Sequence, residues 1–248
     1  DHSSNAEIQE ESLMDLLNLA ANRDNNRMTI AEAGGIILSA MNNHSTNTDI
    51  QEYGCRALLK FVENDNNEVM IAKKEGISTI LSAMKRHSSN ANVQESGCAA
   101  LCILADNNEN NKLRIAAAGG IVMILSAMKN HLFNANVQEY GCAALWKLAE
   151  NDNNQVMIDD EGGTAMIVSR MESHPFNINI QHYGCAALQN LALNEKNRVA
   201  IAEAKGITTI LFAMKTHSSN ANVQEYGCGA LSNLAVNNDK NRVTIAEE

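Results

Sequence analysis

The chain has 248 residues, of which 45% are apolar and 19% are charged, so it can bury a core and is not a disordered tail. Its formal net charge of −10 argues against a nucleic-acid partner, because binding a phosphate backbone requires clustered Lys and Arg. A single Pro and 4% aromatic residues favour helices over strands. No apolar run approaches the roughly 18 residues of a membrane span, so membrane insertion is not expected.

One motif recurs along the whole chain. The tripeptide Ile/Val-Gln-Glu returns every 42–44 residues, with His replacing Glu once. It begins at Ile8, Ile50, Val93, Val137, Ile180 and Val223. A cysteine, a histidine and a glycine keep the same period, so the chain is built from repeats.

Each repeat is predicted to contain three helices, and the last complete repeat shows why. Segment 197–204 is a short helix that Lys205-Gly206 ends, because glycine is the usual stop at a helix C-terminus. In segment 207–214 apolar residues recur at i, i+3, i+4 and i+7, which predicts a second, amphipathic helix.

The third and longest helix of this repeat runs from about Asn220 or Asn222 to Ala235. Asn222, with Glu225 three residues later, fits a capping box at its start. The second helix near 36–38 lacks two residues that the other repeats have, so we expect a shortened or distorted helix there.

A three-helix unit of about 43 residues resembles the armadillo repeat. The resemblance rests on the glycine elbow, on Ile-x-x-Ile-Leu-x-Ala-Met in the second helix, and on Gly-Cys-Ala-Ala-Leu-x-Asn-Leu-Ala at 184–192 in the third. It covers the whole chain and implies an all-α fold, a right-handed α-α superhelix of the armadillo-like solenoid type. The two-helix HEAT repeat is the alternative, but the short helix before each glycine favours the armadillo unit.

When each repeat is counted from the first helix of the armadillo unit, the chain is a single solenoid with five complete repeats between two partial ones. The partial repeats are 1–22 and 240–248, and the complete ones are 24–64, 67–107, 110–151, 153–194 and 196–237. Neither end carries the polar capping repeat that solenoids normally need for solubility. We therefore expect a piece of a longer array, whose uncapped ends allow end-to-end self-association.

In armadillo proteins, as the resemblance implies, the third helices stack and line a concave groove along which an extended peptide runs. A ladder of asparagines on these helices binds the peptide backbone. The matching positions here are Asn18, Lys60, Ile103, Lys147, Asn190 and Asn233. An Asn amide can donate and accept a hydrogen bond, whereas Lys cannot accept and Ile can do neither. The middle of the ladder is therefore poorly suited to backbone binding.

Nuclear-import receptors of this family carry a Trp one turn before each Asn. The corresponding positions here hold Met14, Arg56, Ala99, Ala143, Ala186 and Gly229. Because no aromatic slot is present to sandwich a lysine stem, we reject an import receptor. Arg56 is kept as a candidate groove residue.

A second ladder is acidic at five of its six positions. It consists of Glu10, Glu52, Glu95, Glu139, His182 and Glu225. These carboxylates would attract basic side chains of a peptide. The simpler interpretation, which we favour, is that each Glu caps its own helix and balances the helix dipole. Both can hold, because a capping carboxylate still contributes negative potential.

All four tyrosines share one position of the repeat: Tyr53, Tyr140, Tyr183 and Tyr226. Packing against the neighbouring repeat is the favoured interpretation, and contact with a partner is the alternative. The only Trp, Trp146, stands where other repeats hold residues of mixed polarity, which indicates partial exposure. Trp146 could contact a partner through its ring or fill space between repeats, and the sequence supports the two interpretations equally.

The recurring cysteines and histidines are interpreted as structural. Packed helices lie roughly 8–10 Å apart, whereas disulfide Cα atoms must come within about 7 Å, so one cysteine per repeat is a small buried residue. Free thiols suit a reducing compartment, the cytoplasm or also the nucleus. The histidines end the second helices, where a cation suits the dipole, and one per repeat cannot converge on a metal. No catalytic, cofactor or metal site is predicted.

The predicted function is a non-enzymatic protein–protein interaction module that binds an extended, basic peptide or a partner protein along the third helices. The candidate groove residues are Asn18, Glu52, Arg56, Lys60, Glu95, Glu139, Tyr140, Trp146, Lys147, Tyr183, Asn190, Glu225, Tyr226 and Asn233. The alternative is a scaffold segment of a larger signalling protein, docking intramolecularly through its ends or its convex face.

Overall fold

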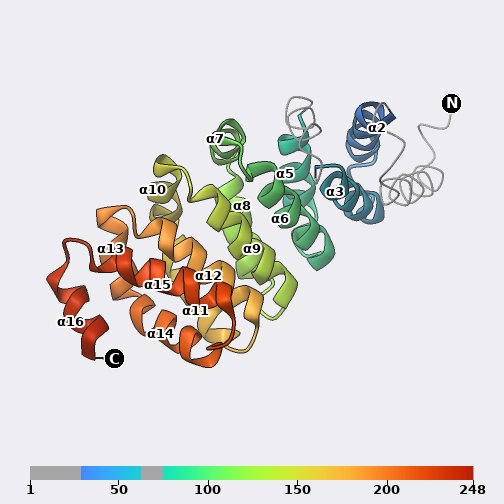
Figure 1. The fold of residues 1–248 in the computed structure, drawn as a ribbon. Coiled ribbons are helices and arrows are strands. Elements are labelled where there is room, and N and C mark those ends of the chain that lie inside the picture. Colours follow the sequence, from blue (N-terminus) through green and yellow to red (C-terminus); the bar gives the residue numbers. More distant parts are fainter. Residues whose placement is uncertain (1–28, 63–74, 248) are drawn as a thin grey trace. The chain divides into compact units, whose positions relative to one another are not determined.

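The computed structural model describes residues 29–62 and 75–247, and its regular elements in these ranges are α-helices (Figure 1). They belong to two compact units, residues 1–131 and 132–248. The described helices of the first unit are α2 (Thr29–Asn43), α3 (Thr48–Val62), α5 (Gly76–Arg86), α6 (Ala91–Ala105), α7 (Glu109–Ala117) and α8 (Gly120–Asn130). Those of the second are α9 (Ala135–Leu148), α10 (Asp152–Asp160), α11 (Gly163–Ser173), α12 (Ile178–Leu191), α13 (Glu195–Glu203), α14 (Gly206–Thr216), α15 (Ala221–Ala235) and α16 (Asp239–Glu247).

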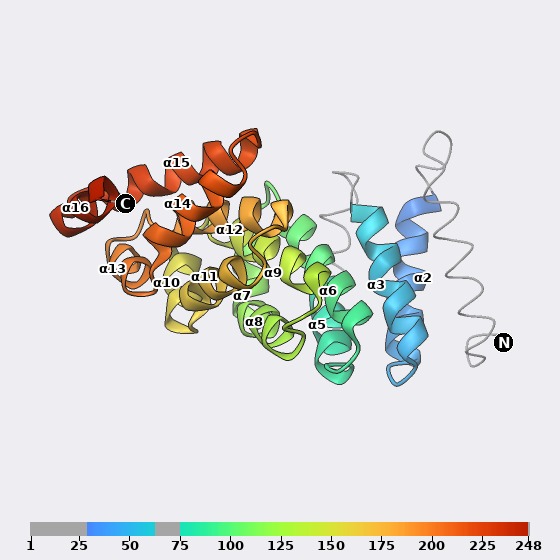
Figure 2. The same ribbon diagram turned by 90° about the horizontal axis from the view of Figure 1, so that it is seen from below.

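The third helices of the repeats make the most extensive helix–helix contacts. In the first unit α3 packs along α6, and in the second α12 packs against both α9 and α15 (Figure 2). Their inner sides supply the core, since Cys142, Leu145 and Leu148 of α9 are fully buried. The opposite side of these helices is left to carry polar residues.

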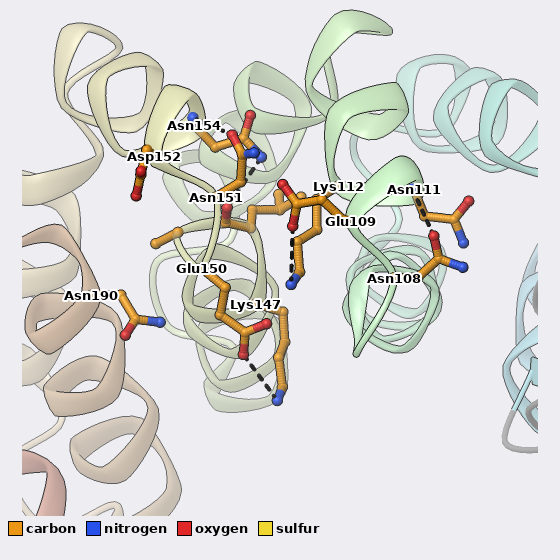
Figure 3. A network of polar contacts seen from close by, with 12 residues as sticks. Asn108, Glu109, Asn111, Lys112, Lys147, Glu150, Asn151, Asp152, Asn154 and Asn190 are labelled. Carbon is orange, nitrogen blue, oxygen red and sulfur yellow. Dashed lines mark hydrogen bonds and ion pairs between the residues drawn. The ribbon is translucent and has the colours of Figure 1, made fainter.

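Asparagine starts most of the helices. The side chains of Asn90, Asn134, Asn177 and Asn220 cap the third helices, and those of Asn108, Asn151 and Asn194 cap first helices (Figure 3). The capping box predicted at Asn222 and Glu225 is therefore wrong. Asn220 is the cap of α15 and accepts a hydrogen bond from the Val223 N–H at 3.0 Å, so Asn222 already lies in the first turn.

The elbow between first and second helices requires a left-handed backbone, which the shared glycine does not supply. The residue with φ of 65–81° is the one before it: Glu75, Gly119, Gly162 or Lys205. The shared glycine begins the second helix. At Gly120 a Cβ would lie 2.8 Å from the Ile115 carbonyl oxygen, so the close approach of the chain explains the glycine.

Helix α2 differs from the other repeats. It runs unbroken from Thr29 to Asn43 through Gly34-Gly35, so the first and second helices of this repeat are fused. The expected shortened or distorted helix near 36–38 is not found. The repeat that is two residues shorter thus has a continuous helix in place of an elbow.

A glutamine joins the second helix to the third helix that follows in four of the described repeats. Gln181 is 1% exposed, and its Nε2 donates to the carbonyl oxygens of Met171 at 2.8 Å and His174 at 2.9 Å. The same pair of bonds is made by Gln51, Gln94 and Gln224. Carbonyls in the last turn of a helix have no partner within that helix, so the Gln of the recurring tripeptide caps it.

The histidines terminate the second helices, as predicted, and also connect repeats. His87, His131, His174 and His217 are the C-cap residues of α5, α8, α11 and α14. The Nε2 of His87 donates to the Ser45 carbonyl and that of His217 to the Pro175 carbonyl, both at 2.8 Å. His87 and His217 therefore fix their loops to the loop of the preceding repeat, whereas His174 binds the Arg170 carbonyl of its own helix.

Replacing Gln181 by Met keeps the volume but leaves two buried carbonyls without a donor. We expect Gln181→Met to lower the free energy of unfolding by about 1–3 kcal/mol. Urea denaturation followed by circular dichroism measures this, with Asn153→Met at an exposed position as the control. Equal midpoints for the two variants would show that the glutamine cap is dispensable.

Candidate functional site

Two asparagines of the predicted ladder lie at equivalent, half-buried positions of α12 and α15. Asn190 Nδ2 donates to the Trp146 carbonyl at 3.3 Å, and Asn233 Nδ2 donates to the Gln189 carbonyl at 2.9 Å. Each amide thus links its own third helix to the preceding one. This bond orients the side chain and makes the Oδ1 oxygen the atom available to a ligand N–H. Asn18 lies outside the described residues.

The middle of the ladder carries no amide. Lys147 Nζ lies 3.4 Å from Glu150 Oε1 and 4.0 Å from the centre of the Trp146 ring (Figure 3). This ammonium is therefore held by Trp146 on its own helix and by Glu150, which follows the end of α9. In the first unit Lys60 is exposed and Ile103 is half-buried.

The acidic ladder joins successive third helices. Glu52 Oε2 accepts a hydrogen bond from Asn92 Nδ2 at 3.1 Å, and Glu139 Oε1 accepts one from Asn179 Nδ2 at 3.0 Å. Glu52 also lies 3.8 Å from the Arg56 guanidinium.

The interpretation that each glutamate caps its own helix is wrong where the caps are seen. Asn134 and Asn220 occupy the N-cap positions, so Glu139 and Glu225 come after the first turn. Glu95 is half-buried and Glu225 is exposed. These carboxylates keep the negative potential that a basic ligand would require.

Four aromatic side chains from α9, α12 and α15 meet on the same side of the second unit. This aromatic cluster consists of Trp146, His182, Tyr183 and Tyr226. The Trp146 ring centre lies 5.9 Å from that of Tyr183 and 5.4 Å from that of Tyr226, and His182 stacks on Tyr183 at 4.6 Å. All four side chains stay partly exposed, as do Tyr53 and Tyr140. The cluster spans three consecutive repeats.

Four of the six positions that correspond to Trp in import receptors offer no room for an aromatic ring, whereas Arg56 is exposed and Met14 lies outside the described residues. Ala99, Ala143 and Ala186 are at most 3% exposed. At Gly229 a Cβ would lie 2.6 Å from the Gln189 side chain, because α12 and α15 pack closely at this point.

The chemistry of the buried thiols is set by burial. Desolvation raises the pKa of Cys55, Cys142 and Cys185 to about 12, so these thiols are protonated and inert at neutral pH. Cys228 is exposed, contrary to prediction, because none of the described helices packs over α15 as α15 packs over α12.

In the described ranges no three His, Cys, Asp or Glu side chains are grouped as metal ligands. No single described helix is long and apolar enough to cross a membrane, and only the pair α7 and α8, bent by 69°, passes that test when taken together.

The arrangement of helices is that of armadillo repeat solenoids. A designed armadillo repeat protein shares 16% identity and a TM-score of 0.79, over 91% of this chain and 92% of that chain. A second designed armadillo repeat protein, in complex with the peptide (KR)4, shares 14% identity and a TM-score of 0.76, over 90% and 92%. An engineered protein from a structural genomics consortium shares 22% identity and a TM-score of 0.79, over 93% and 92%.

The family follows from the sequence comparison. The family model described as LRRK2 ARM repeat matches residues 6–204, so the chain belongs to the LRRK2 ARM repeat family. No curated protein matches the sequence. The predicted armadillo-type fold is thus confirmed.

Several residues that organise this face were not identified from sequence. Asn111, Asn154 and Asn241 each donate from Nδ2 to a carbonyl of the third helix that precedes them, at 2.8, 3.1 and 3.0 Å. Arg198 donates to the Ala192 and Leu193 carbonyls at 3.1 and 3.2 Å. The regular recurrence of these asparagines was the available signal.

His182 provides a pH-dependent reporter of the aromatic cluster. Burial lowers its imidazole pKa below the ordinary 6.5, and the Glu225 carboxylate partly opposes this. The folded state therefore binds fewer protons than the unfolded state, and the unfolding free energy falls as pH drops from about 6.5 towards the lowered pKa. Trp146 is the only Trp, and imidazolium quenches indole fluorescence on contact.

We expect Trp146 fluorescence to fall with a midpoint below pH 6.5, and the transition to disappear in His182→Gln. His174→Gln, which removes a half-buried imidazole outside the cluster, is the control and keeps the transition. A transition that survives in His182→Gln would contradict the assignment.

Proposed function

We propose that this chain is a non-enzymatic binding module that holds an extended peptide, or an extended segment of a partner protein, across α9, α12 and α15. We call the side of these helices that carries Glu139, Lys147, Asn190, Glu225 and Asn233 the third-helix face. The observation that carries the proposal is the equivalent placement of Asn190 and Asn233, whose amides are oriented by bonds to the preceding helix. Peptide N–H groups would donate to their Oδ1 oxygens.

The comparison with a designed armadillo repeat protein supports a peptide as ligand, since that protein binds (KR)4 at 14% identity to this chain. The acidic ladder supports basic side chains in the ligand, with Glu139 and Glu225 as its carboxylates in the second unit. Lys147, on the same helix as Glu139, weakens this field. The buried thiols favour a reducing compartment, so we propose the cytoplasm or nucleus as its location.

A second surface favours the scaffold alternative. Phe133 and Phe176 occupy equivalent loop positions in consecutive repeats and are 97% and 80% exposed. Other repeats carry Thr46, Ser89 or Ser219 there. Apolar side chains this exposed at a rigid edge are typical of docking surfaces. The exposed Cys228 likewise fits self-association through α15, which sedimentation velocity over a concentration range would detect.

The double variant Asn190→Ala/Asn233→Ala tests the main proposal. Selection from a library of short random peptides on the wild-type chain should yield binders whose affinity falls at least tenfold in the variant, because two backbone hydrogen bonds of roughly 1 kcal/mol each are lost. Circular dichroism establishes that the variant is folded, and Asn153→Ala on α10 is the control. Peptides that bind the wild type and the double variant equally would show that the binding site lies outside the third-helix face.

Charge reversal tests the acidic ladder separately. We expect Glu139→Lys/Glu225→Lys to weaken binding of (KR)4 about tenfold, because surface ion pairs are worth roughly 0.2–1 kcal/mol each and reversal adds repulsion. Glu195→Lys/Glu203→Lys on α13 makes the same change of net charge away from the face. An equal loss of affinity in both variants would show that net charge alone, and not the acidic ladder, determines binding.

A further inference from the structure

In each repeat, the type of residue three positions after the asparagine-ladder position depends on the residue at that ladder position. Where the ladder holds Lys or Ile, the later residue is acidic, and where it holds Asn, the later residue is apolar. The six pairs are Asn18 and Ala21, Lys60 and Glu63, Ile103 and Asp106, Lys147 and Glu150, Asn190 and Leu193, and Asn233 and Val236.

The backbone places this second residue alike in every described repeat. Its N–H donates to the carbonyl of the ladder residue, from Leu193 to Asn190 at 3.1 Å and from Val236 to Asn233 at 3.2 Å. The same bond links Glu150 to Lys147 at 3.4 Å. The pairs therefore share this backbone bond and differ in their side chains.

That difference divides the third-helix face. At the C-terminal end of α9, Lys147 and Glu150 form an ion pair at 3.4 Å. Just after α12 and α15, Leu193 and Val236 are 57% and 47% exposed. The six positions 186, 190, 193, 229, 233 and 236 carry no charged side chain. The side chains of this strip offer hydrogen-bond acceptors and apolar surface, and the nearby cation of Arg242 donates to the Ala235 carbonyl at 2.9 Å.

We propose that the α12–α15 part of the face binds an extended segment whose apolar side chains contact Leu193 and Val236 while its backbone lies along Asn190 and Asn233. This assignment rests on the proposed peptide-binding function and names the ligand chemistry of that site. Successive side chains of an extended chain point to opposite sides. The ligand side chains that face the helix C-terminal ends are therefore apolar, and the alternate ones point towards Glu225 and the aromatic cluster.

The spacing of the apolar residues follows from the same geometry. Residues on one side of an extended chain recur every second position, about 6.6–6.8 Å apart. Packed helices lie roughly 8–10 Å apart, and the same-side spacing of the ligand that comes nearest to this distance is that between residues i and i+2. The lengths of the Leu193 and Val236 side chains make up the difference between the two distances. A lone exposed apolar residue is ordinary, but equivalent residues beside two ladder asparagines form a continuous strip.

Selection from short random peptides on the wild-type chain tests this assignment. We expect enrichment of apolar residues at i and i+2, and at least a tenfold loss of affinity for the enriched peptides in Leu193→Glu/Val236→Glu. The matched control is Val199→Glu/Val243→Glu, which changes two residues that are 48% and 55% exposed on first helices of the same unit. This control should bind as the wild type does, and circular dichroism verifies the fold of both.

The outcomes separate the two proposals. The selection could yield basic peptides without an apolar preference. If Asn190→Ala/Asn233→Ala loses them and Leu193→Glu/Val236→Glu still binds them, the apolar strip is overturned and peptide binding stands. Apolar peptides that lose affinity equally in the Val199→Glu/Val243→Glu control would also overturn it. Enrichment of no peptide, or of peptides indifferent to the asparagine variant, would overturn both proposals.

Discussion

Helix ends are the constraint on which this molecule depends. A chain of helices of 9–15 residues has many termini, and each exposes backbone groups that its own helix cannot satisfy. Side-chain amides meet this need at many of these ends, although the second helices α5, α8, α11 and α14 begin without a side-chain cap. Asparagine caps the N-termini, while Gln181 and its equivalents, together with Asn111 and its equivalents, bind the C-terminal carbonyls of the preceding helix. Uncharged amides suit the task because they donate and accept without the desolvation cost of a buried charge.

The third-helix face is shaped by the same bonds. Asn190 and Asn233 hold neighbouring third helices together before any ligand arrives, and so do the Glu139 bond to Asn179 and the contacts of Trp146. A side chain whose rotamer is fixed by such a bond loses less entropy when it binds. Structural and binding roles therefore coincide in these residues, and a test of binding must control for folding.

The period, the three helices and the armadillo fold could be predicted because apolar spacing and glycine are local signals. The capping residue was misplaced by two positions, since Asn220 and Asn222 are equally good caps by composition. The role of Gln181 was missed because its carbonyl partners lie seven and ten residues earlier, across a loop. The partners of Glu52 and Glu139 lie 40 residues away in the sequence, so only the packed structure reveals them.

The central claim is that the ligand lies across α12 and α15. Backbone chemical-shift mapping on the isotope-labelled chain, titrated with the strongest selected peptide, tests it directly. The account predicts that shifts centre on Asn190, Leu193, Asn233 and Val236. Shifts centred on Phe133 and Phe176 would contradict it and assign binding to the loop edge.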